Sequence, residues 1–193
     1  MANRAAADRE QVEVTGRQQL RDWLAEHHET SPGVWVVRWK KAVDADRHVT
    51  YEDLVLECLA FGWVDSVPKK VDDDRGAVLC TPRKAGSGWS RPNKERVARL
   101  EAEGLMAPAG RAAVERARAD GSWSLLDDVE DLVVPDDLAA ALEARGARAV
   151  WDALGRSPRR GALEQLVQAR TEKTRAARVE RFADRTAAGE RPA

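Results

Sequence analysis

Hydrophobic residues recur at helical spacing near the start of the chain. Leu20, Trp23, Leu24 and His27 fall on one face of a helical repeat. This pattern predicts a first helix over residues 17–29. The charged, alanine-rich residues before it show no such period, which indicates a disordered tail over residues 1–14.

A pattern typical of strands follows the first helix. β-branched and aromatic residues fill positions 34–40, and Trp35, Val37 and Trp39 share one face of the predicted strand. Shorter runs predict further strands over residues 63–64, 68–71 and 76–81. The polar segment between the last two is a plausible hairpin turn.

Helical patterns with recognisable start and stop residues fill most of the remaining chain. Thr50 is a favoured capping residue and Gly62 a favoured stop, so the apolar segment between them predicts a central buried helix. Prolines and glycines delimit further helices over residues 92–103, 108–120, 135–145, 147–154 and 157–187. Ser157 is the expected cap of the last one.

These elements predict an α+β fold that is mostly α overall. A small antiparallel sheet packs with helices over residues 15–130, and a helical C-terminal region over 131–188 packs on that core. Residues 189–193 are expected to fray. The length of 193 residues suits one domain, or one domain with a helical extension.

Composition narrows the classes of function. The net charge is −1, whereas dedicated nucleic-acid binders are usually strongly basic, so nucleic acid is not the expected partner. The N-terminus lacks the apolar run of a signal peptide and no run reaches membrane-spanning length, so we expect a cytoplasmic protein without a membrane span. No metal-ligand spacing occurs, and we expect no metal or cofactor.

Cys58 and Cys80 lie in apolar runs and are expected to be buried thiols.

Four groups of residues together resemble one known family. They are 23–24 with 34–36; 50–53 with 58–65; 81–84 with Ser87, Trp89, Ser90 and Asn93; and 135–138 with 141–142, 172–175 and Arg178. On these residues the chain resembles the bacterial YdeI/OmpD-associated, or bacteriocin-protection, family over residues 15–190. The resemblance implies a mixed fold with a helical C-terminal part and an association with stress or defence. It implies no reaction.

The segment around residues 81–94 has the composition of a binding site. Residues 81–99 contain six bases and one acid, and a Gly/Ser-rich loop leads there into a helix N-terminus. Such a terminus favours anions, Arg83 suits a carboxylate or phosphate, and tryptophans can wall a pocket. We therefore expect a small anionic or aromatic ligand at the following residues: Trp63, Asp65, Arg83, Lys84, Ser87, Trp89, Ser90 and Asn93.

Two other interpretations of these residues remain open. In a structural one, the tryptophans belong to the core and Arg83 pairs with Asp65 or with an acidic segment. In an enzymatic one, Asp65 acts as an acid or base on the ligand. No catalytic motif surrounds it, so the sequence leaves open whether the protein is an enzyme.

Charge is also distributed unevenly along the second half of the chain. Residues 120–143 contain eight acids and no base, whereas residues 156–191 contain ten bases and five acids. The two segments predict pairing within one chain, or else a protein-interaction module or a homodimer held by opposite charges. A nucleic-acid surface on the basic helices is a further, less favoured alternative.

Overall fold

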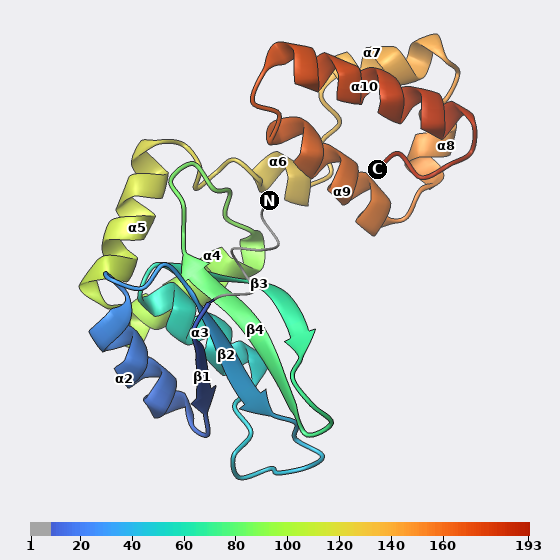
Figure 1. Cartoon of the computed structure of the whole chain (residues 1–193). Coiled ribbons are helices and arrows are strands. Elements are labelled where there is room, and N and C mark those ends of the chain that lie inside the picture. Colours follow the sequence, from blue (N-terminus) through green and yellow to red (C-terminus); the bar gives the residue numbers. More distant parts are fainter. Residues whose placement is uncertain (1–8) are drawn as a thin grey trace. The chain divides into compact units, whose positions relative to one another are not determined.

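The computed structural model describes residues 9–193, which form two compact units (Figure 1). The first unit comprises the chain up to Ser87 together with Pro92–Gly121, and the second comprises Gly88–Arg91 and Ser122–Ala193. The first contains a sheet with helices and the second is helical, so the predicted α+β class with a helical C-terminal region is confirmed. Within the described residues, no helix is both long enough and apolar enough to cross a membrane.

Among the described residues, the first unit has a four-stranded sheet in the order β1-β2-β4-β3. The pairs of β2 (Val34–Trp39) with β4 (Arg75–Pro82), and of β4 with β3 (Trp63–Lys70), are antiparallel. This confirms the predicted hairpin. The two short strands expected before the turn are a single strand, β3, whose register with β4 shifts between Asp65 and Pro68.

The edge strand β1 (Gln11–Val14) corrects the prediction of a disordered tail up to residue 14. It pairs in parallel with β2, which makes the sheet mixed rather than antiparallel. Val14 is fully buried. A strand this short hardly shows a period in the sequence, and its backbone hydrogen-bond partners lie far along the chain. Residues 1–8 of the predicted tail lie outside the described residues.

α3 (Tyr51–Ala60) is the buried helix of the first unit. Thr50 caps it as predicted, because its hydroxyl accepts a hydrogen bond from the Asp53 backbone N–H at 3.0 Å. Every residue over 54–60 is buried. Gly62 follows the helix with φ +73°, a left-handed conformation that favours glycine and explains why the helix stops there.

Further helices of the first unit are α2 (Arg17–His27), α4 (Arg91–Ala102, all but Arg91 in this unit) and α5 (Pro108–Ala119). Their bounds lie close to the predicted ones. α5 passes α3 so closely that a Cβ on Gly110 would lie 2.2 Å from the Ala60 carbonyl oxygen. Only glycine therefore fits at this crossing.

The two cysteines are buried free thiols, as predicted. Cys58 on α3 faces Cys80 on β4. Hydrogen bonding to Cys80, together with burial, raises the pKa of Cys58 well above its usual range. The Cys58 thiol is therefore protonated at neutral pH and is a poor nucleophile.

The second unit is built from short helices around one apolar core. They are α6 (Asp127–Glu130), α7 (Asp136–Ala144), α8 (Arg148–Ala153), α9 (Arg156–Val167) and α10 (Glu172–Ala187). Leu138, Leu142, Trp151 and Phe182 are fully buried at its centre. α6 was not expected from the sequence, because a single helical turn has no detectable repeat.

The helix predicted over 157–187 is in fact two helices, α9 and α10. Thr171 separates them with extended backbone, and its hydroxyl accepts a hydrogen bond from the Thr174 backbone N–H at 3.1 Å. Thr171 is thus the cap of α10. The expected cap, Ser157, lies inside α9, whose N-cap is Gly155.

Candidate ligand site in the first unit

The tryptophans expected to wall a pocket are core residues of different units. Trp63 is 1% exposed in the first unit, where its Nε1 donates to the His28 carbonyl at 3.2 Å and its ring and that of Trp23 form a T-shaped pair. Trp89 is 1% exposed in the second unit, with its ring centroid 5.1 Å from that of Trp123. Their placement agrees with the structural interpretation.

The Gly/Ser-rich loop after β4 closes on itself. The backbone N–H and the hydroxyl of Ser87 both donate to the Lys84 carbonyl, at 3.2 and 2.6 Å. The Ser87 hydroxyl therefore holds a turn, whereas the Lys84 side chain is exposed. Ser90 directly precedes α4 and is grouped with the second unit.

Asp65 and Arg83 are brought together where β3 begins and β4 ends. Asp65 accepts a hydrogen bond from the Tyr51 hydroxyl at the start of α3. Burial lowers the pKa of Arg83 to about 10, and the nearby Asp65 carboxylate opposes that shift. Burial, followed by the hydrogen bond to Asp65, raises the pKa of Tyr51 to about 12. The phenol therefore stays protonated and keeps its role as the donor at neutral pH.

Asn93 reaches the same region through Arg96. The Arg96 guanidinium donates to both carboxylate oxygens of Glu52, with Nη2 at 2.7 Å, and Nη1 donates to the Asn93 side-chain oxygen at 3.0 Å. Tyr51 and Asp65 both lie within electrostatic range of Arg96. α4 thereby supplies a third element to the region where α3 and β3 already meet.

Arg38 on β2 is the least compensated charge in this region. Its Nη1 donates to the Val49 carbonyl oxygen at 2.7 Å. Its Nε is buried and has no hydrogen-bond partner within the described part of the chain, nor does its guanidinium form an ion pair there. Burial lowers the pKa of Arg38, while Cys80 and Tyr51 nearby oppose the shift.

Five residues thus form what we call the Asp65 cluster: Arg38, Tyr51, Asp65, Arg83 and Arg96. It carries three guanidinium groups. Asp65 acts electrostatically on Arg83 and Arg96, and Glu52 pairs with Arg96, whereas Arg38 pairs with no carboxylate of the described residues. A desolvated guanidinium near a phenol hydroxyl can bind an anion by charge and hydrogen bonding.

Sequence reasoning found Asp65, Arg83 and Asn93 but missed Arg38, Tyr51 and Arg96. A signal for Arg38 exists in the strand pattern, because it follows Val34 and Val36 on the same alternating face of β2. An arginine that continues a buried apolar face marks a charge drawn into the interior. Tyr51 and Arg96 carry no comparable local signal, since their positions depend on how helices pack.

The acidic and basic segments meet within the second unit. Glu130 accepts from Arg156 and Arg160 at 3.0 and 2.9 Å, and Asp137 is held bidentately by Arg175 at 2.7 and 3.0 Å. These acidic and basic residues therefore pair within one chain, and the homodimer and the interaction module stay predictions.

Family models match two parts of the chain. Residues 12–113, just over half of the chain, match a domain of unknown function, DUF8412. Residues 131–189 match the family described as "Bacteriocin-protection, YdeI or OmpD-Associated", which confirms the expected family there; the earlier stretches of resemblance fall mostly in the first match. No curated protein and no solved structure matches. The chain therefore belongs to the DUF8412 family, and its C-terminal segment to the YdeI or OmpD-associated family.

Proposed function

We propose that the protein is a defence-associated binding protein whose first unit holds a small anionic ligand at the Asp65 cluster. The observation that carries this proposal is the Arg38 guanidinium, buried at Nε without a hydrogen-bond partner or ion pair in the described residues. The association with defence rests on the family name, which speaks of bacteriocin protection.

Burying a charged group costs free energy. A guanidinium that loses water without gaining a carboxylate destabilises the fold, and an uncompensated buried ion is expensive. A buried polar group without a partner calls for an explanation, and a ligand that supplies the missing charge is one. A bound carboxylate or phosphate would accept from Arg38 and restore its lost hydrogen bond.

Tyr51 suggests the rest of the ligand. Tyr51 as a whole residue is 50% exposed, while its hydroxyl is held by Asp65. A fixed phenol ring next to a cationic site offers a stacking face for an aromatic group. An aromatic carboxylate or phosphate ester is therefore the chemical class that we propose.

The test is thermal unfolding of the full chain with phosphate, benzoate and phenyl phosphate. A ligand at one hundred times its Kd stabilises the native state by about 2.7 kcal/mol, which raises Tm by roughly 5 °C or more in a chain of this size. We expect the largest shift with phenyl phosphate. Arg38→Met should abolish it, because the cation that pairs with the ligand is gone.

Arg99→Met is the matched control. Arg99 lies on the exposed surface of α4 and is already paired with Glu103 at 2.8 Å, so its loss changes net charge equally and should leave the shift intact. The proposal fails if none of the three compounds raises Tm. It also fails if the rise survives in Arg38→Met while circular dichroism shows that this variant is folded.

A further inference from the structure

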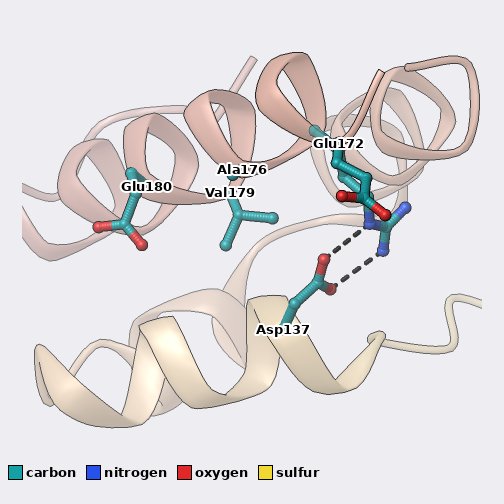
Figure 2. Close-up of a pocket in the computed structure, with 6 residues that line it drawn as sticks. Asp137, Glu172, Ala176, Val179 and Glu180 are labelled. Carbon is teal, nitrogen blue, oxygen red and sulfur yellow. Dashed lines mark hydrogen bonds and ion pairs between the residues drawn. The ribbon is translucent and has the colours of Figure 1, made fainter. Parts of the chain in front are cut away.

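An open groove lies between α7 and α10 of the second unit. It has a volume of about 340 Å³ and is lined by Asp137 of α7 and by Glu172, Arg175, Ala176, Val179 and Glu180 of α10. Figure 2 shows Glu172 and Glu180 towards opposite ends of this stretch of α10, with Val179 between them directed at α7. The groove thus has apolar side chains in its middle and carboxylates towards its ends.

A second hollow of about 100 Å³ shares Arg175 with the groove. Its wall is mainly aliphatic and includes Val129, Val133, Leu163 and Val167. Since one water molecule occupies about 30 Å³ of liquid, the hollow has room for a short aliphatic side chain. It therefore extends the groove with a site of apolar character.

The backbone at the rim of this hollow is unusual. Leu132 has φ +57°, the left-handed region that leucine avoids at a cost of roughly 1–2 kcal/mol. The turn closes α6 by hydrogen bonds from Val133 N–H to the Asp128 carbonyl and from Leu132 N–H to the Val129 carbonyl, at 2.9 and 3.2 Å. This geometry leaves the Val133 side chain 51% exposed beside the hollow.

The linings of the two hollows are acidic in sum. They contain four carboxylates, those of Asp128, Asp137, Glu172 and Glu180, against the one guanidinium of Arg175. Arg145, which lines neither hollow, pairs with Glu180 at 2.6 Å. Two negative charges still remain, and Asp128 and Glu172 form no ion pair with any described residue.

We propose that the groove and the hollow, together the Arg175 surface, dock a cationic amphipathic peptide segment. Glu172 and Glu180 lie eight residues apart on one face of α10, about 12 Å along its axis. A helical peptide with lysines seven residues apart and leucines between them matches this order of acid, apolar and acid. This site is independent of the anion site proposed for the first unit.

The experiment is titration of the full chain with a fluorescein-labelled amphipathic Lys/Leu peptide of that design, followed by fluorescence anisotropy at physiological salt. Saturable binding is expected, weakened at least tenfold by Glu172→Lys, which places a cation opposite the peptide lysine. Val133→Asp should weaken it as well, because an apolar contact is lost. Thermal unfolding of both variants establishes that they are folded.

Glu101→Lys is the control, because Glu101 is exposed on α4 of the first unit and its reversal changes net charge equally. Three results would overturn the proposal: no saturable binding, equal binding of a scrambled peptide of the same composition, or equal weakening by Glu101→Lys. Tighter binding of a peptide with glutamates in place of the lysines would show that the Arg175 surface binds anions through Arg175 instead. A dimer of the chain alone that Glu172→Lys dissociates would make a second copy the occupant.

Discussion

Glu57 in the first unit and Glu130 in the second are both nearly fully buried, and each carboxylate is held by two arginines at 2.6 to 3.0 Å. The two units thus neutralise a buried acid in the same way. Arg38 departs from this pattern, because it is desolvated and has no carboxylate partner among the described residues. Among the described residues these two buried carboxylates have counterions, whereas Arg38, like Arg9 and Arg159, has a buried guanidinium nitrogen without a hydrogen-bond partner, and we propose that a ligand supplies the partner of Arg38.

The units also differ in how closely their helices approach. In the first, α5 touches α3 through Gly110, where a Cβ has no room. In the second, Gly161 of α9 has open space around its Cβ position, and two hollows interrupt the surface. The first unit is therefore expected to be the more sensitive to added volume, and the second the more tolerant.

The largest expected effect is that of Gly110→Ala. The new methyl group would clash with the α3 backbone, which cannot move without shifting the buried helix. We expect a loss of about 3 kcal/mol in the free energy of unfolding. Urea unfolding followed by tryptophan fluorescence measures it. A variant as stable as the parent would show that the helices separate easily.

Glu130→Gln should have the next largest effect. The amide removes the charge that two arginines share. We expect the free energy of unfolding to fall by about 2 kcal/mol, after allowing for the partial exposure of those arginines. Glu57→Gln should have a similar effect in the first unit. If only one of these two substitutions destabilises its unit, the two buried carboxylates do not stabilise their units in the same way.

A smaller effect concerns pH. Hydrogen bonding from Arg160 and from Arg175 lowers the pKa of Glu130 and of Asp137 respectively. Because the folded pKa lies below the unfolded one, the unfolded chain binds more protons, so stability is present above about pH 4 and is lost as pH falls through the folded pKa values. Asp137→Asn should flatten the fall in Tm between pH 5 and pH 3. An unchanged slope would contradict this assignment.

The smallest effect has the opposite sign. Gly161→Ala adds a methyl group in open space within α9, where alanine is favoured over glycine. We expect a gain of roughly 0.5–1 kcal/mol, measured by urea unfolding. Set beside Gly110→Ala, the same substitution then stabilises one unit and destabilises the other. If both substitutions destabilise the protein, the inferred difference in helix packing between the two units is wrong.

Local signals predicted much of this fold. Thr50, Gly62 and the proline of α5 mark helix ends through backbone chemistry that depends only on neighbouring residues, and those bounds are close to the observed ones. The strand β1 and the break before α10 were not predicted. β1 forms because its backbone pairs with that of β2, which is not apparent from local sequence. Threonine also occurs at positions that cap no helix, so Thr171 alone does not indicate the break before α10.

The candidate site was predictable only in part. Asp65 and Arg83 lie near each other as expected, whereas Trp63 and Trp89, which resemble pocket walls in a glycine-rich context, are core residues. Long-range packing decides whether an indole is buried, and local composition does not report it. For the same reason the sequence does not distinguish Arg38, whose Nε is buried, from Arg99, which is exposed and paired with Glu103.

The most direct test of the account is nuclear magnetic resonance of arginine side-chain Nε–H groups during titration with phenyl phosphate. The Arg38 signal is assigned by its absence in Arg38→Met. We predict that this signal moves and saturates with ligand, because its unpartnered N–H gains an acceptor, while the Arg99 signal does not. An Arg38 signal that stays in place at saturating ligand would contradict the claim that Arg38 is there to bind an anion.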